Sequence, residues 1–341
     1  MYQTTGTSVL PVALPLEEGA LLGGTQVAWC AYGERSDDNV ALLLHDVTHS
    51  HRALGPVETE PYRPSGGGAA LVGEGRPLDT TTMHVLVPNL LGSPFGSTSP
   101  VTVDERAGVP YGTALPTLTV LDMARAVAAL LRGMKVGRVR ALVGVGLGGL
   151  VALQLAALFP ELAAAVVVLG AAKSLPESLR ERHGLMRHML RMDPDFHEGH
   201  YPLGAGPQRT LRKQYLGYLR LLHAPTLPDT APLPESMPWE AEAEAFARTF
   251  DANAWALLCT AYAGAELSES LPLIRSPVLL ATAAEDALAP PSRVRDTYHL
   301  LSAAGVRAHY HELPPPCTHA DLLSQAGRLH GPLRDFLRRR G

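Results

Sequence analysis

The chain has 341 residues, of which 46% are hydrophobic and 18% charged, so it is long and apolar enough to bury a sizeable core. Its formal net charge of −4 gives no general attraction for nucleic acid or for an anionic membrane. Apolar runs are too short to cross a bilayer, and three scattered cysteines form neither a disulfide framework nor a paired-cysteine zinc pattern.

The N-terminus has no basic region, and Pro11 and Pro15 interrupt its apolar run, so no signal peptide is predicted. Unpaired cysteines are typical of a reducing compartment. We therefore expect a cytoplasmic protein that binds neither nucleic acid nor a membrane.

Short apolar runs bounded by turn residues predict strands that are buried on both faces. They cover residues 41–46, 83–89, 139–144, 164–170 and 276–282. Helical patterns lie between or after them, at residues 117–134, 147–160 and 290–305. This alternation predicts an α/β fold with a mostly parallel sheet and right-handed crossovers.

The alternation stops between residues 174 and 267, where successive amphipathic helices are predicted instead. The strand and helix pattern then resumes. We therefore expect a core formed by residues 1–173 and 268–341, with residues 174–267 as a helical lid.

Four glycines, Gly144, Gly146, Gly148 and Gly149, lie between a predicted strand and a predicted helix. Gly144, Gly146 and Gly149 fit a dinucleotide-binding loop, in which backbone amides hold a pyrophosphate. That interpretation requires an acidic residue about 20 positions later. The sequence has only apolar residues and glycine there, so the dinucleotide hypothesis has an incomplete motif.

The same segment also fits a nucleophile elbow, G-x-S-x-G, whose tight turn exposes the central side chain above the sheet. Here the central residue is Gly146 in place of serine. The turn and the amide donor of Leu147 are expected to remain, without the attacking oxygen. A glycine-rich turn that only permits close packing of helix and sheet is the structural alternative.

An α/β-hydrolase places an acid and then a histidine after its elbow. Asp286 follows one predicted strand, and His319 follows the strand-like run 306–313, so both occupy the expected positions. A backbone amide near Val47 or Thr48, after the strand at 41–46, is predicted to be the second oxyanion donor.

Side chains near these loops suggest two other chemistries. His45, His49 and His51 with Asp46 suggest a metal site, but the acid and histidine that a zinc cluster requires after His51 are missing, so no metal is predicted. Cys317 is a possible substitute nucleophile, although a residue two positions from His319 is poorly placed to reach the imidazole.

Several longer segments resemble the homoserine O-acetyltransferase family of α/β-hydrolase-fold acyltransferases. They are residues 75–100, 111–126, 192–201 and 247–262 and the closing blocks around Asp286 and His319. The resemblance covers nearly the whole chain. It implies the α/β-hydrolase fold, with a mostly parallel central sheet flanked by helices, and a homodimer formed through the lid.

In that family an elbow serine takes an acetyl group from acetyl-CoA and passes it to the homoserine hydroxyl. The resemblance makes His319 the base and acid, Asp286 its partner, and Gly146 the position of the missing nucleophile. Acetyl-CoA is then a co-substrate, and no other cofactor is implied. The predicted oxyanion donors are Val47, Thr48 and Leu147.

The substrate-binding positions also depart from the family pattern. The arginine that holds the homoserine carboxylate falls near Gln214, with Arg212 close by, and Ala320 replaces the aspartate that holds the substrate amine. Asn89 is a further predicted substrate-binding residue.

Two functions remain open at this point, both involving a small-molecule acyl donor or acceptor. One is a degenerate acyltransferase, a pseudoenzyme that binds a small ligand or a partner. The other is an active transferase or hydrolase in which His319 activates the acceptor hydroxyl or a water directly, in a single displacement.

Overall fold

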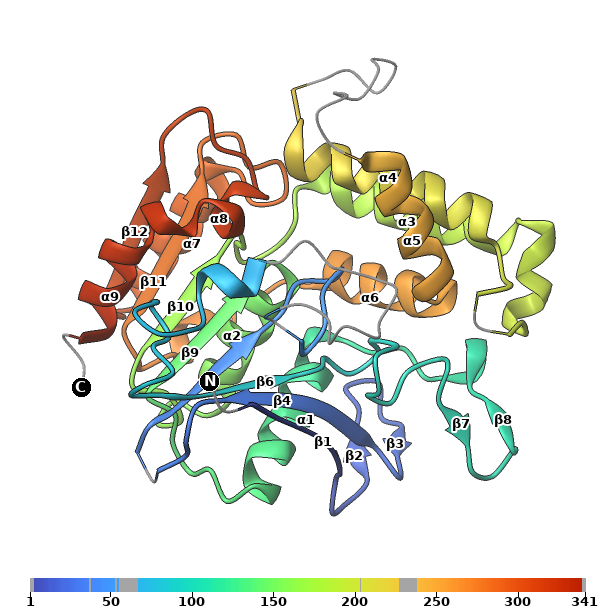
Figure 1. Ribbon diagram of the computed structural model, residues 1–341, viewed down its shortest axis with the longest axis horizontal. Coiled ribbons are helices and arrows are strands. Elements are labelled where there is room, and N and C mark those ends of the chain that lie inside the picture. The colour runs from blue at the N-terminus through green and yellow to red at the C-terminus, as the bar shows by residue number, and fades with distance from the viewer. Residues whose placement is uncertain are drawn as a thin grey trace.

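The computed structural model describes residues 3–36, 38–52, 54, 67–202, 204–226 and 238–338, and within them an eight-stranded sheet forms the centre of the protein (Figure 1). The strand order is β1-β4-β6-β5-β9-β10-β11-β12. From β6 to β12 all neighbouring strands run parallel. The predicted mostly parallel sheet is therefore confirmed.

The strands of the large sheet are β1 (Gln3–Val9), β4 (Gln26–Tyr32), β5 (Val40–Leu44), β6 (His84–Pro88), β9 (Ala141–Val145), β10 (Val166–Leu169), β11 (Val278–Ala283) and β12 (Ala308–Leu313). Two small antiparallel pairs are β2 (Leu14–Pro15) with β3 (Leu21–Leu22) and β7 (Val103–Asp104) with β8 (Val109–Pro110).

The helices are α1 (Val120–Gly133), α2 (Leu147–Leu158), α3 (Glu177–Arg191), α4 (Gln208–His223), α5 (Trp239–Thr249), α6 (Ala252–Gly264), α7 (Pro291–Ala303), α8 (Asp321–Ser324) and α9 (His330–Arg338). Short 3-10 turns cover Gly67–Ala70, Gly112–Ala114, Pro194–Gly199, Leu271–Leu273 and Ala326–Arg328.

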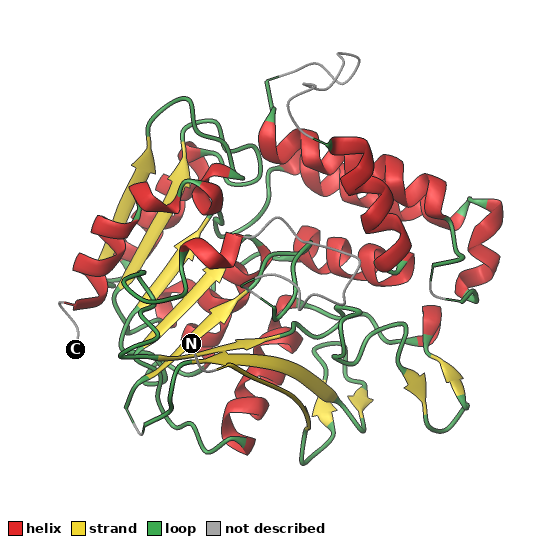
Figure 2. Ribbon diagram, viewed as in Figure 1, coloured by secondary structure: helices red, strands yellow, loops and turns green. Residues whose placement is uncertain are grey.

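The central strands are apolar at every position because both of their faces are covered (Figure 2). Along β9 and β10, alternate residues enter different cores: Leu142 and Val166 join one, and Val143 and Val167 join the other. Helices α1, α2 and α7 contribute to the first core, and α8 and α9 to the second.

The antiparallel strands β1 and β4 were not predicted from the sequence. They add to the sheet beyond β6, with β1 paired to β4 and β4 paired to β6. In β1 partly buried residues alternate with exposed ones, so this edge strand lacks the continuous apolar run that identified the central strands.

Helices α3 to α6 gather at one end of the sheet, as Figure 1 shows. Their buried aromatic side chains, among them Tyr218, Phe246 and Trp255, belong to the first core. These helices therefore share a core with one face of the sheet. In the described part of the chain no helix is long and apolar enough to span a membrane.

We expect Gly148→Ala to destabilise the fold by about 1–3 kcal/mol, because the added methyl group would collide with backbone atoms that cannot move away. A Cβ at Gly148 would lie 2.3 Å from the Leu44 carbonyl oxygen. Gly184→Ala on α3 is the matched control, since nothing lies within 4 Å of its Cβ position. Urea unfolding measures the stability of both variants. Equal unfolding midpoints would contradict a close contact between α2 and the end of β5.

Candidate functional site

The turn between β9 and α2 has the geometry of an elbow. Gly146, which immediately precedes α2, has φ 52° and ψ −119°, a conformation that side-chain-bearing residues rarely adopt. Its amide donates to the Leu169 carbonyl at 2.9 Å. A Cβ at Gly144 would lie 2.3 Å from the Gly148 carbonyl oxygen, so the neighbouring glycines permit a sharp turn.

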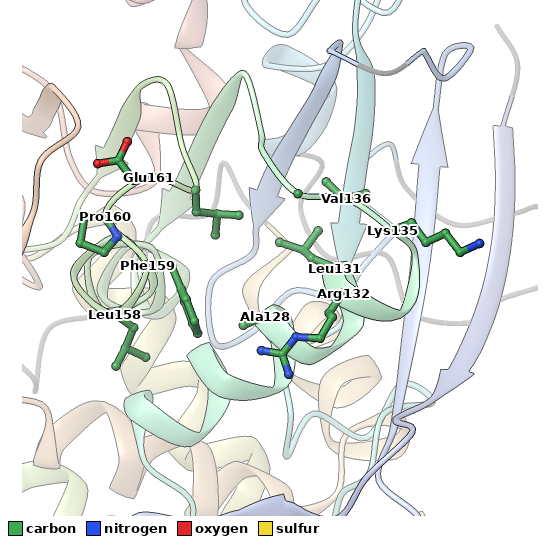
Figure 3. A pocket seen from close by; sticks show the side chains of 11 residues that line it. Ala128, Leu131, Arg132, Lys135, Val136, Leu158, Phe159, Pro160 and Glu161 are labelled. Atoms are coloured by element: carbon green, nitrogen blue, oxygen red, sulfur yellow. The ribbon is translucent and has the colours of Figure 1, made fainter.

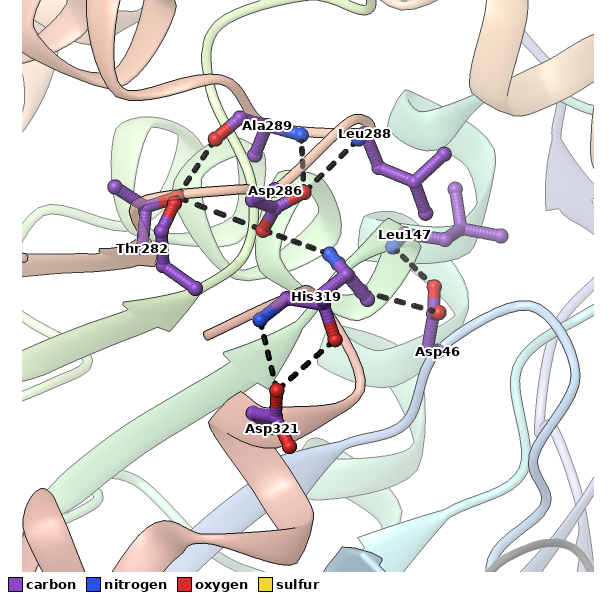
Figure 4. Close-up of polar contacts among 10 residues, drawn as sticks. Asp46, Leu147, Thr282, Asp286, Leu288, Ala289, His319 and Asp321 are labelled. Atoms are coloured by element: carbon purple, nitrogen blue, oxygen red, sulfur yellow. Dashed lines mark hydrogen bonds and ion pairs between the residues drawn. The ribbon is translucent and has the colours of Figure 1, made fainter. Parts of the chain in front are cut away.

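The carboxylate of Asp46 occupies the space that a side chain at the elbow would fill. A Cβ built on Gly146 would lie 2.0 Å from Asp46 Oδ1 and 2.3 Å from its Cγ. Asp46 Oδ1 also accepts a hydrogen bond from the Leu147 amide at 2.9 Å (Figure 4). The predicted oxyanion donor of the elbow is therefore bonded to a carboxylate of this same chain.

Asp46 lies two residues after the end of β5, and the imidazole of His45 fixes the backbone there. His45 Nδ1 donates to the Asp46 carbonyl at 2.8 Å, and its Nε2 accepts from the Leu90 amide at 3.0 Å. Burial lowers the pKa of His45 to about 3, so the ring is neutral and both nitrogens are used within the fold. Across the described residues no group of three or more His, Cys, Asp or Glu could hold a metal ion.

His319 and Asp286, which the sequence analysis placed in separate loops, meet in the structure. His319 Nδ1 donates to Asp286 Oδ2 at 2.8 Å. Asp286 Oδ1 accepts from the amides of Leu288 and Ala289 at 2.9 and 2.8 Å (Figure 4). These bonds hold the carboxylate in place and orient the imidazole so that Nε2 points away from Asp286.

His319 lies between two carboxylates. Its Nε2 is 3.8 Å from Asp46 Oδ2, too far for a hydrogen bond, and has no hydrogen-bond partner among the described residues. Burial lowers the pKa of His319, but the charge and hydrogen bond of Asp286 and the nearby Asp46 outweigh it and raise that pKa to about 10. At neutral pH His319 is therefore an imidazolium.

The positive charge of His319 also explains why Asp46 is ionised. Burial of Asp46 favours its neutral form, yet its interactions with His319 dominate and lower its pKa below the ordinary value. The site thus holds one buried cation between two buried anions.

Three polar side chains from helices α3, α4 and α6 are buried where the charge of Asp46 acts on them. Tyr218, Tyr262 and His183 each have a polar atom, Oη or Nε2, without a hydrogen-bond partner within the described chain. Burial first, and then the charge of Asp46, raises the pKa of both tyrosines well above the usual value, so both hydroxyls stay protonated.

His183 completes this group as a hydrogen-bond acceptor. Its Nδ1 donates to the Cys259 carbonyl at 3.1 Å, and burial lowers its pKa to about 4, so Nε2 carries a lone pair at neutral pH. We call the buried group of Asp46, His183, Tyr218, Tyr262 and His319 the polar cluster. Of these five residues, only His319 was predicted from the sequence to be catalytic.

Other predicted site residues form contacts within the fold. The amide group of Gln214 donates to the Met186 carbonyl and accepts from Trp255 Nε1. Arg212 forms ion pairs with Glu240 and Glu244 of α5.

Two further predicted substrate-binding residues lie in loops. Asn89 exchanges hydrogen bonds with Ser93, and the Ala320 amide donates to the Leu222 carbonyl. For all four residues, substrate binding stays a prediction.

Val47 and Thr48 are buried in the turn after Asp46, and the oxyanion role assigned to them also stays a prediction. Cys317 is buried, and its sulfur accepts from Arg328 Nη1 at 2.7 Å. Burial raises the pKa of that thiol, which disfavours a thiolate nucleophile.

The protein also has a cavity of about 620 Å³, whose lining residues Figure 3 shows. It is lined by the ends of α1 and α2 and the segments that follow them, including Arg132, Lys135 and Phe159. Since α2 begins at the elbow and ends here, the cavity is at the opposite end of that helix from Asp46.

Comparisons with known proteins agree with this architecture. The family described as alpha/beta hydrolase fold matches residues 66–326. The L-serine/homoserine O-acetyltransferase of Streptomyces lavendulae is 38% identical over 204 residues, which cover 59% of this chain and 53% of that protein. The homoserine O-succinyltransferase of Burkholderia mallei (strain SAVP1) is 29% identical over 358 residues, covering 96% of this chain and 94% of that protein.

Among solved structures, esterase E22 superposes with a TM-score of 0.85 and 19% identity, covering 98% of this chain and 100% of the other. This likeness supports the fold class alone. Together with the matched family, it confirms the predicted α/β-hydrolase fold.

We expect Asp46→Asn to lower the pKa of His319 by about one to three pH units, because it removes one of the two carboxylates that stabilise the imidazolium. Asparagine retains the shape of the side chain. NMR titration of the His319 ring protons measures the change. An unchanged titration would show that Asp46 does not act on His319.

The raised pKa of His319 also predicts how stability depends on pH. The folded-state pKa lies above the ordinary value of 6.5, so this contribution is fully present below pH 6.5 and is lost as the pH rises through about 10. Unfolding free energies between pH 6.5 and 10 should therefore fall more steeply for the wild type than for His319→Gln. Parallel curves would contradict the assignment.

Proposed function

Because this chain belongs to the α/β-hydrolase-fold family and is similar in sequence to homoserine O-acyltransferases, we propose that it keeps their site but not their acyl-serine reaction. In this proposal the polar cluster binds a small polar molecule, and no acyl group becomes covalently attached at the elbow. The observation that carries the proposal is the Asp46 carboxylate, which fills the space beside Gly146 and accepts from the Leu147 amide.

Acyl transfer from a thioester requires a nucleophile and donors for the oxyanion that develops on the carbonyl oxygen. Gly146 supplies no oxygen. The Leu147 amide already donates to Asp46 Oδ1, and the negative charge of Asp46 would repel a second anion at the same place. On this proposal the site therefore lacks both the nucleophile and the free oxyanion donor that the acyl-serine reaction requires.

The alternative of a single displacement requires His319 to accept a proton from the acceptor hydroxyl. The raised pKa of His319 opposes this, because an imidazolium has no lone pair to offer at neutral pH. The dinucleotide hypothesis meets a different obstacle, since a pyrophosphate at the start of α2 would face the Asp46 carboxylate.

The polar cluster supplies both kinds of hydrogen-bonding group that a small ligand needs. Tyr218 and Tyr262 offer hydroxyl donors, and His183 offers an acceptor nitrogen. Because buried polar groups are nearly always hydrogen-bonded, these atoms favour an occupant that pairs with them.

We expect no release of CoA from acetyl-CoA above the background of His319→Ala, with or without homoserine, and no acetyl adduct in the intact mass. Gly146→Ser alone should also remain unacetylated, because its side chain collides with Asp46. The double variant Gly146→Ser with Asp46→Gly removes that collision and frees the Leu147 amide, so it should gain an acetyl group.

Mass spectrometry of the intact proteins and a thiol assay for CoA measure these outcomes. CoA release by the wild type that requires both His319 and homoserine would overturn the proposal. Thermal unfolding of each variant shows whether a negative result comes from a folded protein.

A further inference from the structure

We propose that the cavity at the ends of α1 and α2 binds a free small amphiphile, whose apolar tail enters the cavity and whose single anionic headgroup pairs with Arg132. This inference goes beyond the proposed function, because it concerns a second site, at the end of α2 that is remote from the elbow. It is carried by the volume of the cavity, its apolar lining and the cationic character of the segment that forms it.

The cavity has the size and the lining of a small-molecule site. Its volume is about 620 Å³, within the range of roughly 300–1,000 Å³ that is usual for ligand pockets. Two of its lining residues, Leu131 and Val136, are buried, whereas Leu158 and Phe159 each expose 36% of their surface. A ligand tail that covers these exposed apolar side chains removes them from water, which favours binding.

Hydrogen bonds fix the two loops that bound the cavity. After α1, the Val136 amide donates to the Leu131 carbonyl at 2.8 Å, which ends the helix in a tight turn. After α2, the Leu162 amide donates to the Phe159 carbonyl at 2.9 Å. Val139 joins the two loops, because its amide donates to the Leu162 carbonyl at 2.7 Å. The walls of the cavity are thus held in place by the fold, so binding requires little ordering of the chain.

The segment that forms most of the cavity is cationic. Residues 123–160 contain four arginines and one lysine and no aspartate or glutamate, although the whole chain has a formal net charge of −4. Among the described residues that line the cavity, Glu161 is the one acid, and in Figure 3 its carboxylate points away from Arg132. An anionic headgroup is therefore attracted to this region, and a cationic headgroup is repelled.

The end of a helix carries partial negative charge, which would oppose an anion if its carbonyl groups were unpaired. At the end of α1 these groups have donors. The Lys135 amide donates to the Arg132 carbonyl at 3.0 Å, and Arg35 Nη2 donates to the Met134 carbonyl at 2.9 Å. The positive side chains therefore dominate the field at this end of α1.

Arg132 is the residue best placed to hold the headgroup. Its side chain is exposed and forms no ion pair with a described residue, whereas Arg125, earlier on α1, pairs with Asp122. In Figure 3 the Arg132 guanidinium points to the side of the cavity on which Phe159 lies, and Lys135 points away from it. A guanidinium binds a carboxylate through two parallel hydrogen bonds. A carboxylate beside Phe159 can therefore pair with Arg132 while its tail covers the apolar lining.

The test measures binding of decanoate to the full chain by isothermal titration calorimetry, at concentrations below those at which decanoate forms micelles. We expect a Kd of about 1 mM or lower. Octanoate, which is two methylenes shorter, should bind about 15-fold more weakly. Decyltrimethylammonium has the same tail length and the opposite charge, and should not bind. Equal binding of decanoate and decyltrimethylammonium, or no binding of decanoate, would overturn the inference.

Arg132→Gln should weaken the binding of decanoate about tenfold, because it removes the charged partner of the headgroup. Arg209→Gln on α4 is the matched control, since Arg209 is exposed and does not line the cavity, and it should bind decanoate like the wild type. Ala128→Phe fills part of the cavity and should abolish binding, with thermal unfolding as the check on its fold. Unchanged affinity in Arg132→Gln would contradict the inference even if Ala128→Phe does not fold.

A decanoate that carries a diazirine at the end of its tail shows where the ligand lies. After irradiation we expect the label on peptides that contain Leu131 or Phe159. His319→Gln should bind decanoate like the wild type, because the polar cluster is at the other end of α2. Label confined to other peptides, or loss of binding in folded His319→Gln, would show that the ligand binds elsewhere.

Other occupants of the cavity give different outcomes. If sedimentation shows a dimer that Ala128→Phe dissociates, the cavity belongs to an interface between copies of this chain. If the wild type cosediments with phosphatidylglycerol vesicles and Arg132→Gln does not, the cavity faces a membrane surface. Either result would overturn the proposal of a free ligand. The proposed function would be unaffected, because its test is the release of CoA and the acetylation of the elbow.

Discussion

The hydrogen bond from the Leu147 amide to Asp46 Oδ1 is the contact on which the site depends. It joins the start of α2 to the loop after β5, and three local features make it possible. Gly146 leaves room for the carboxylate, Gly148 lets α2 approach the Leu44 carbonyl, and the His45 ring fixes the Asp46 backbone. Any side chain at position 146 would displace Asp46, so the observed position of Asp46 requires glycine at position 146.

The sequence predicted the parts of the fold that follow from local pattern. Continuous apolar runs identified β5, β6, β9, β10 and β11 because strands buried on both faces have few polar positions. Asp286 and His319 could be paired because loops at the carboxyl ends of parallel strands lie at one edge of the sheet. Gly146 was recognised as the centre of an elbow from the spacing of its neighbouring glycines.

Asp46 could not be assigned in the same way. In the sequence it stands among histidines, and a metal site was the natural hypothesis for that cluster. The alternative was hidden because its role depends on contacts with residues far along the chain, Leu147 and His319. One local signal was available: Asp46 lies two residues after a buried strand.

Prediction from the sequence is limited in the same way for helices α3 to α6. Leu211, Tyr215, Tyr218 and Leu222 recur with helical spacing on the buried side of α4, so the sequence could assign Tyr218 to the interior. Periodicity does not distinguish a tyrosine whose hydroxyl is paired from one whose hydroxyl is not. Tyr215 Oη donates to Glu242, whereas Tyr218 Oη has no partner in the described residues, and only the three-dimensional packing separates them.

The charges of the polar cluster constrain one another. Two carboxylates buried at this distance from one imidazole would repel each other if that imidazole were neutral, so protonation of His319 favours the anionic form of Asp46. Conversely, neutralising either carboxylate lowers the pKa of His319. A reaction that neutralises Asp46 therefore changes the proton affinity of His319 in the same event. An array of this kind couples the charge of Asp46 to the proton affinity of His319, which a neutral serine at the elbow could not do.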